Sequence, residues 1–205
     1  MEPQDGLKRA FDIVASAGAL LVLAPLLIGI ALAVRLADGT PVLFCQERVG
    51  LNGVSFQIHK FRTMRQAVGP QVTARSDPRI TPLGRFLRRS KLDELPQLWD
   101  VLRGRMSIVG PRPEVPEMVR LYSDEARRRI LSVRPGLTDP ATLILYDEEA
   151  LLLGPDPERT YVEEILPRKI ALYLDYVETR SFRGDLVLIL RTLAALVAIP
   201  GRATR

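Results

Sequence analysis

The chain has few of the residues that disulfide scaffolds, metal clusters and base-stacking surfaces need. Its single cysteine, Cys45, excludes an internal disulfide framework and gives no hint of secretion. Its single histidine, His59, leaves little material for a His/Cys metal cluster or a serine–histidine triad. Aromatic residues make up only 6% of the chain, so platforms for stacking nucleic-acid bases are sparse. Any chemistry must therefore rest on carboxylates, arginines and lysines.

The overall composition is that of a folded, basic protein. The 205 residues allow one domain with a moderate core, and 47% hydrophobic with 26% charged residues excludes a disordered chain. Lysine and arginine number 29 against 24 acidic residues, and many of these cations lie between positions 85 and 112. This excess predicts an anionic partner: nucleic acid, anionic lipid or a phosphorylated substrate.

A long apolar run near the N-terminus predicts a membrane element. Ile13 to Val34 holds 22 residues without a formal charge. As a straight helix it would reach roughly 33 Å, so length alone favours a single spanning helix. A signal peptide fits less well, because the run is long and no small-x-small cleavage site follows it.

Two features of this run favour a re-entrant hairpin instead of a span. Pro25 lies near its centre, where proline bends or breaks a helix. Lys8 and Arg9 precede the run and Arg35 follows it, so the positive-inside tendency draws both flanks to the cytoplasmic side. We therefore predict a hairpin that enters and leaves one leaflet, with its corner at Ala24-Pro25.

The pattern downstream of this run changes to that of a small sheet. Val42 to Gln46 and Val54 to Phe61 bracket Gly50-Leu51-Asn52-Gly53, and apolar residues alternate with polar ones in the second segment. This pattern predicts a β-hairpin. His59 would lie on one face of a strand, most simply as a surface or structural histidine.

Two adjacent carboxylates lie at the start of a predicted helix. Apolar residues at spacings of three and four follow Leu83, and either Ser90 or Asp93 could cap a helix. Asp93 and Glu94 would fall in its first turn, where acidic residues are common for purely structural reasons. An ionised aspartate near arginines is also what a nucleophile or a magnesium ligand in phosphoryl transfer requires.

A proline-flanked arginine follows these carboxylates in Gly110-Pro111-Arg112-Pro113. The two prolines fix φ on both sides of Arg112, which reduces the freedom lost when its guanidinium binds a phosphate through two hydrogen bonds. Taken alone, this segment could be an ordinary proline-rich turn. Together with Asp93 and Glu94 it predicts phosphate chemistry at a bilayer surface.

The chain resembles the bacterial sugar transferases, in the minimal form called monotopic phosphoglycosyl transferases. The resemblance covers about Lys8 to Arg191. It is carried in order by Lys8-Arg9-x-Phe11-Asp12, the Pro25-broken run, Lys60-Phe61-Arg62-Thr63-Met64, Leu92-Asp93-Glu94-Leu95-Pro96-Gln97-Leu98-Trp99, Met106-Ser107-x-Val109-Gly110-Pro111-Arg112-Pro113 and Arg134-Pro135-Gly136.

The resemblance implies a two-step reaction at the cytoplasmic face of the bacterial inner membrane. Asp93 would attack the β-phosphate of a UDP-sugar, release UMP and carry a phosphosugar, which undecaprenyl phosphate would then accept to start a surface glycan. Glu94 would position or deprotonate the acceptor, and Mg²⁺ would bridge Asp93 and the diphosphate. Arg112 would hold a phosphate. Further candidates for substrate contacts are Lys60, Arg62 and Arg88.

The chain also departs from the family pattern at three places. The hairpin corner, often Ser-Pro, is Ala24-Pro25, so another group must satisfy the backbone there. The segment often read as Ile-Thr-Gly-Trp-Ala-Gln is Leu137 to Thr142, which could alter the sugar pocket. A common aspartate is replaced by Tyr173, with Asp175 two positions later, and this leaves the role of that aspartate open.

These observations predict a mostly helical α+β fold. Residues 1–38 would form the re-entrant membrane anchor, and residues 39–205 a cytosolic catalytic domain with a small β-hairpin, amphipathic interfacial helices and a C-terminal interfacial helix at about 184–199. A buried core helix is the alternative for that last segment. Glu117 to Leu131 is expected to be one charged amphipathic helix.

The expected partners are a UDP-sugar, undecaprenyl phosphate and membrane phospholipids, without nucleic acid. A homodimer is compatible with the sequence, since an apolar face can meet lipid or a second copy. Two rival functions are a membrane-anchored nucleic-acid-binding protein and a non-catalytic membrane scaffold. The sequence does not indicate which sugar is carried.

Overall fold

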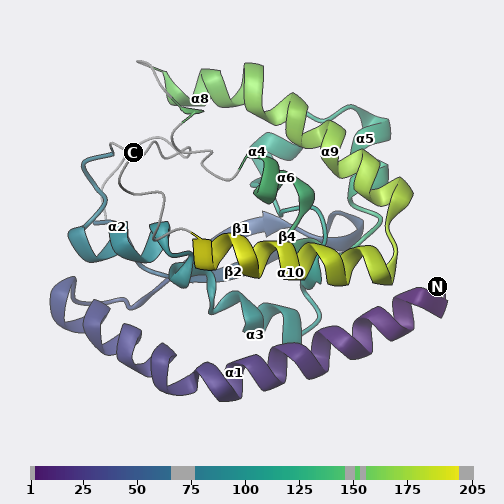
Figure 1. Cartoon of the computed structure of the whole chain (residues 1–205). Coiled ribbons are helices and arrows are strands. Elements are labelled where there is room, and N and C mark those ends of the chain that lie inside the picture. The colour runs from purple at the N-terminus through teal and green to yellow at the C-terminus, as the bar shows by residue number, and fades with distance from the viewer. Residues whose placement is uncertain (1–2, 66–76, 146–150, 153–155, 199–205) are drawn as a thin grey trace.

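Two long helices lie on opposite sides of the molecule, with two small sheets between them (Figure 1). The computed structural model describes residues 3–65, 77–145, 151–152 and 156–198. Helix α1 (Pro3–Ala37) follows one side, and α9 (Leu166–Thr179) follows the other. The fold is a mostly helical α+β arrangement, as predicted.

The two sheets have two strands each. β1 (Leu43–Val49) and β2 (Ser55–Phe61) pair antiparallel, with Val49 opposite Ser55, which confirms the predicted β-hairpin. β3 (Ser107–Val109) and β4 (Gly136–Thr138) pair in parallel. The second sheet brings the Gly-Pro-Arg-Pro segment beside the Arg-Pro-Gly segment.

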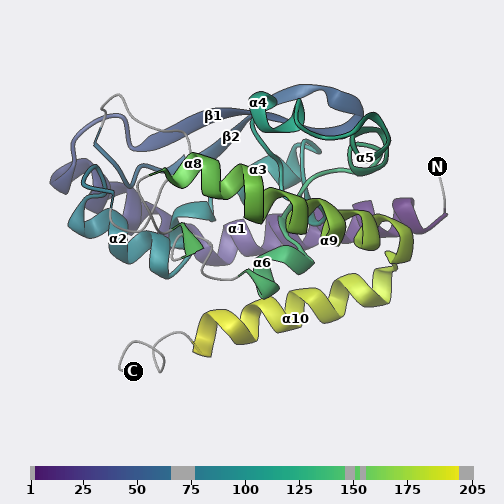
Figure 2. The same cartoon turned by 90° about the horizontal axis from the view of Figure 1, so that it is seen from above.

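Further helical elements connect and cover these sheets. In Figure 2, α10 (Phe182–Ala198) runs along the lower edge of the view, the β1–β2 hairpin along the upper edge, and α9 between them. The remaining elements in the described part of the chain are η1 (Leu51–Gly53), α2 (Pro82–Arg89), η2 (Leu92–Glu94), α3 (Gln97–Leu102), α4 (Pro116–Val119), α5 (Asp124–Ile130), α6 (Pro140–Ile144), α8 (Pro157–Thr160), the π-helical turn η3 (Tyr161–Ile165) and α10 (Phe182–Ala198).

One predicted helix is divided in two. Glu117 to Leu131 was expected to be continuous, but α4 ends at Val119 and α5 begins at Asp124. Ser123 explains the break, because its side chain accepts a hydrogen bond from the Ala126 amide and so caps the new helix.

Helix α1 differs from the predicted hairpin. It is a single helix of 35 residues that continues through Pro25. Its ribbon curves without turning back (Figure 1). The corner expected at Ala24-Pro25 is therefore not seen. Proline removes only its own backbone donor and crowds one turn, so a long apolar segment on either side can remain helical with a bend.

Both ends of α1 are attached to the rest of the protein. Near the N-terminus, Lys8 forms an ion pair with Asp185 of α10, and Arg9 donates hydrogen bonds to the carbonyls of Val101 and Leu102 at 2.7 and 3.0 Å. Near the C-terminus, Val34 is completely buried in a core with Phe61 and Leu87. The helix thus lies along the globular part instead of projecting from it.

Much of the apolar surface of α1 is nevertheless exposed. A stretch of this helix is long and apolar enough to cross a membrane, and only 11% of that stretch is buried inside the protein. Its exposed apolar side chains include Val14, Leu21, Val22, Ile28, Leu32 and Leu36. This surface indicates membrane association.

Among the described residues, the core consists of three clusters. The largest joins α4, α5, α6, η3 and α9 and includes Met118, Ile130, Ile165 and Tyr173. A second joins α1, β2 and α2, and a third contains Ile58, Val101 and Met106. Asp93 and Glu94 lie in η2, between α2 of the second cluster and α3 of the third.

Candidate functional site

Asp93 and Glu94 lie in a short 3₁₀ turn between two helices. Ser90 is the C-cap of α2, because its hydroxyl bonds back to the carbonyls of Phe86 and Leu87 at 2.8 and 3.1 Å. Lys91 then adopts a left-handed conformation with φ of 56°, and η2 follows. The prediction that Ser90 or Asp93 is the N-cap was therefore wrong, whereas both carboxylates do fall in the first turn of a helix, the short 3₁₀ helix η2. The separate turn lets the two adjacent side chains face different surroundings.

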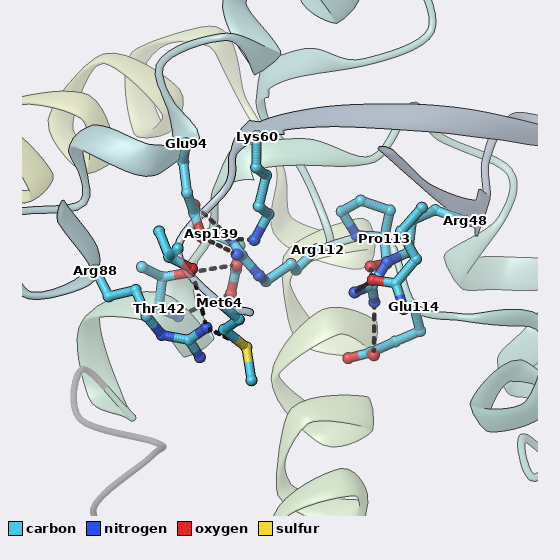
Figure 3. A network of polar contacts seen from close by, with 12 residues as sticks. Arg48, Lys60, Met64, Arg88, Glu94, Arg112, Pro113, Glu114, Asp139 and Thr142 are labelled. Atoms are coloured by element: carbon cyan, nitrogen blue, oxygen red, sulfur yellow. Dashed lines mark hydrogen bonds and ion pairs between the residues drawn. The ribbon is translucent and has the colours of Figure 1, made fainter. Parts of the chain in front are cut away.

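Glu94 is held by two cations. Its Oε1 accepts a hydrogen bond from Lys60 Nζ at 2.9 Å, and its two carboxylate oxygens contact the two terminal nitrogens of Arg112, with Nη1 and Oε2 3.1 Å apart. Figure 3 shows both cationic side chains approaching the Glu94 carboxylate. Burial would raise the pKa of Glu94, but the charges of Arg112 and Lys60 outweigh it and hold that pKa well below its usual range.

Asp93 has a different environment from its neighbour. Its side chain is 6% exposed, and its Oδ1 is buried without a hydrogen-bond partner in the described part of the chain. Burial, reinforced by the charge of Glu94, raises the pKa of Asp93 to about 6, against the opposing effect of Lys60 and Arg88. A buried carboxylate with an unpartnered oxygen and nearby cations is a candidate nucleophile.

Arg112 is supported by the parallel sheet beneath it. Gly110 donates its amide hydrogen to the Thr138 carbonyl at 3.1 Å, and Gly136 donates to the Pro111 carbonyl at 2.9 Å. A Cβ atom at Gly110 would lie 2.3 Å from the Arg134 carbonyl oxygen, so this close approach requires glycine. The Gly-Pro-Arg-Pro and Arg-Pro-Gly segments thus form one support for the guanidinium.

The structure brings Lys60 and Arg88 to this site but uses Arg62 elsewhere. Arg88 contacts Thr63 and Met64 and is among the charges that act on Asp93. Arg62 is 7% exposed and donates to the backbone carbonyls of Thr40, at 2.7 Å, and Asp38. Arg62 therefore fixes the connection between α1 and β1, and we leave it out of the proposed substrate contacts.

The segment that departs from the family pattern also lies near Arg112. Asp139 is 1% exposed and caps α6, accepting hydrogen bonds from the Thr142 amide at 3.0 Å and hydroxyl at 2.7 Å. Burial raises the pKa of Asp139, with Arg112 acting against that rise. Tyr173 is fully buried in the same region, whereas Asp175 is exposed on α9.

Sequence reasoning missed a group of buried polar residues behind the Arg112 segment. It consists of Arg48, Glu114, Tyr161 and Lys169 (Figure 3 shows Arg48 and Glu114). Glu114 directly follows the recognised motif, but an acid at that position has no distinctive spacing. Nothing in the sequence pairs it with residues of β1 and α9.

The fit of Mg²⁺ can be judged from these donors. Among the residues described, no three His, Cys, Asp or Glu side chains gather to hold a metal. Mg²⁺ in phosphoryl-transfer sites commonly uses one or two carboxylates together with substrate phosphates and water. The Oδ1 of Asp93, which has no hydrogen-bond partner among the residues described, suits that mode of binding.

Comparison with known proteins places this site in a family. The model for the bacterial sugar transferases matches residues 3–198. The chain is 42% identical over 197 residues to a UDP-glucose:undecaprenyl-phosphate glucose-1-phosphate transferase of Caulobacter vibrioides, covering 93% of this chain and 69% of that one. It is 53% identical over 147 residues to the exopolysaccharide production protein PSS of Rhizobium leguminosarum bv. phaseoli, covering 67% and 73%.

Some relatives are much longer. An undecaprenyl-phosphate glucose phosphotransferase of Komagataeibacter xylinus is 40% identical over 198 residues, which cover 91% of this chain but only 35% of that protein. The matched region includes every element that carries the carboxylates, Lys60 and Arg112. The chain belongs to the bacterial sugar transferase family.

Proposed function

We propose that this protein transfers a sugar 1-phosphate from a UDP-sugar to undecaprenyl phosphate and so starts exopolysaccharide synthesis. The observation that carries the proposal is the buried, unpartnered oxygen of Asp93 beside the Lys60–Glu94–Arg112 cluster. The name of the Caulobacter relative gives this reaction with glucose, and the name of the Rhizobium relative gives exopolysaccharide production. UDP-glucose is the first donor to test, because glucose is the sugar in the Caulobacter relative's name.

The first step is attack by Asp93 on the donor. An ionised oxygen of Asp93 forms a bond to the β-phosphorus, and the bond from that phosphorus to the oxygen bridging the two phosphates breaks. UMP leaves with the bridging oxygen and its electron pair, and the phosphosugar stays on Asp93. Because an anion approaches an anion, this attack requires cations nearby, and Arg112, Lys60 and Arg88 meet that need.

The second step regenerates the enzyme. A phosphate oxygen of undecaprenyl phosphate bonds to the same phosphorus, and the bond to Asp93 breaks, so the carboxylate returns unchanged. The low pKa of Glu94 makes it a poor general base while it contacts Arg112 and Lys60. We therefore assign Glu94 the role of orienting these two cations and positioning the acceptor.

Asp93 would also hold Mg²⁺ together with the donor diphosphate. When bound, the ion supplies positive charge that neutralises the phosphates during transfer. Removing divalent cations with a chelator and restoring Mg²⁺ tests this assignment through the rate of UMP release.

The membrane arrangement that we propose is monotopic, on the cytoplasmic face of the inner membrane. Both ends of α1 contact the same globular part, through Asp185 and Val101 at one end and Phe61 at the other. A helix that crossed the bilayer would separate its ends by the hydrocarbon thickness, about 30 Å. An α1 that lies in one leaflet with its apolar face in lipid keeps the site at the interface, where a soluble nucleotide sugar and a lipid phosphate both arrive.

The direct test is UMP release from a panel of UDP-sugars in the presence of undecaprenyl phosphate. Wild-type protein should release UMP and form the lipid-linked sugar with one or a few donors. Asp93→Asn should lose this activity, while Asp175→Asn, which changes an exposed carboxylate on α9, should retain it. UMP release by folded, membrane-bound Asp93→Asn at the wild-type rate would refute the proposal and favour a scaffold.

A further inference from the structure

A second buried charge cluster lies behind the Arg112 segment, and the proposed reaction does not use it. Glu114 is 6% exposed and Lys169 is 3% exposed, and their Oε1 and Nζ atoms are 2.7 Å apart. Tyr161 donates its hydroxyl hydrogen to the same Glu114 oxygen at 2.7 Å and accepts a hydrogen bond from Lys169 at 2.8 Å. The other Glu114 oxygen lies 3.7 Å from Nη1 of Arg48.

Stability alone does not account for such a cluster. Removing two charges from water costs several kcal/mol per ion, and apolar residues of similar size often replace buried ion pairs without loss of stability. Opposite charges inside a protein do fix geometry, because breaking one contact leaves the partner buried and unpaired. The cluster is therefore better understood by what it holds in place.

The cluster holds the backbone that follows Arg112, at Pro113 and Glu114. The same Arg48 guanidinium donates to the Pro113 carbonyl at 3.1 Å, and Val49 donates its amide hydrogen to the Glu114 carbonyl at 3.0 Å. On the near side, Gly110 and Pro111 are fixed by the parallel sheet. Arg112 lies between these two anchors, and its side chain extends to Glu94.

We propose that Glu114 is a positioning residue for Arg112. Lys169 and Tyr161 fix its carboxylate from the α9 side, Arg48 bridges it to Pro113 from β1, and together they hold the backbone from which Arg112 reaches a donor phosphate. The inference rests on the proposed function for the identity of the ligand, a nucleoside diphosphate group. It adds a set of residues, distant from the reacting atoms, that determine how tightly that group is bound.

A double-mutant cycle on donor binding tests this role. The dissociation constant of UDP is measured by titration calorimetry for the full chain in detergent, with the wild type, Glu114→Gln, Arg112→Ala and the double variant. Glu114→Gln keeps the shape of the side chain but removes the charge that faces Lys169. We expect it to weaken UDP binding about tenfold, as loss of a well-placed hydrogen bond to a charged group does.

The combination of variants separates positioning from general destabilisation. If Glu114 acts through Arg112, Glu114→Gln causes no further weakening in the Arg112→Ala background. Asp5→Asn is the control, since it changes a half-buried acid paired with Arg180 at the start of α1. It should lower the melting temperature and leave UDP affinity unchanged.

The possible results give distinct conclusions. Equal weakening by Glu114→Gln with and without Arg112, or a lower melting temperature with unchanged UDP affinity, would overturn the positioning role. Absence of UMP release by wild-type protein that binds UDP would refute the proposed function but leave the cycle valid. Absence of UDP binding by wild-type protein would overturn both.

Discussion

The two terminal guanidinium nitrogens of Arg112 donate hydrogen bonds to the two carboxylate oxygens of Glu94, so the pair has two parallel contacts. This geometry also suits a phosphate, which presents two oxygens at similar spacing. Glu94 therefore already orients Arg112, the cation that we propose binds the donor phosphate. Lys60, on β2, brings a second positive charge to the same carboxylate.

The first prediction concerns this two-pronged geometry. Arg112→Lys keeps a positive charge but loses the planar fork, so it should raise the KM for the UDP-sugar about tenfold or more. Steady-state UMP release at saturating acceptor measures the change. A KM within twofold of wild type would show that only the charge of Arg112 matters.

The second prediction concerns pH and stability. Burial raises the pKa of Asp93 to about 6, above that of an unfolded aspartate, so the folded state holds an extra proton between about pH 4 and 6. The stability contributed by this proton is fully present below about pH 4 and is lost as the pH rises through 6.

At pH 7.5, without Mg²⁺, Asp93→Asn should therefore be more stable than wild type by up to about 3 kcal/mol, and the difference should vanish below about pH 4. Urea unfolding across this range measures it. An Asn variant less stable than wild type at neutral pH would contradict the unfavourable burial of the Asp93 charge.

The third prediction concerns Arg62. Because its guanidinium binds the carbonyls of Thr40 and Asp38, Arg62→Met should cost about 1–3 kcal/mol of stability by leaving them unsatisfied. The KM for the UDP-sugar should stay at the wild-type value. A raised KM with an unchanged melting temperature would instead show that Arg62 contacts the substrate.

The fourth prediction concerns membrane topology. Since both ends of α1 contact the globular part, tags at the N-terminus and the C-terminus should both be digested by protease in inverted inner-membrane vesicles and both be protected in intact spheroplasts. A tag at the N-terminus that is digested only in spheroplasts would establish a spanning helix.

Sequence patterns predicted the parts of the site that depend on local spacing. The β-hairpin followed from alternation and a glycine-bracketed turn. The motifs gave Lys60, Glu94 and Arg112 as separate candidates, the structure brings them into contact, and their roles stay predictions. The cap at Ser90 was misread because a serine hydroxyl can end one helix as readily as it begins the next. The glycine and two prolines around Arg112 are visible in the sequence, but no local pattern predicts the parallel β3–β4 pairing that supports this segment.

Long-range contacts explain the remaining differences. Arg62 lies in a recognised motif beside Lys60, and only the folded structure shows that its partners are backbone carbonyls more than twenty positions earlier. Glu114 and Lys169 are 55 positions apart and have no shared pattern. For α1, Pro25 predicted a break, but the extent of the bend depends on what contacts the helix on either side.

The covalent step at Asp93 is tested most directly by intact-protein mass spectrometry. Wild-type protein incubated with a turnover-competent UDP-sugar and Mg²⁺, without undecaprenyl phosphate, should gain the mass of one sugar phosphate. The added mass should disappear when the lipid acceptor is supplied, and Asp93→Asn should never acquire it. UMP release by wild-type protein with no adduct under rapid acid quench, or an adduct on Asp93→Asn, would contradict the account.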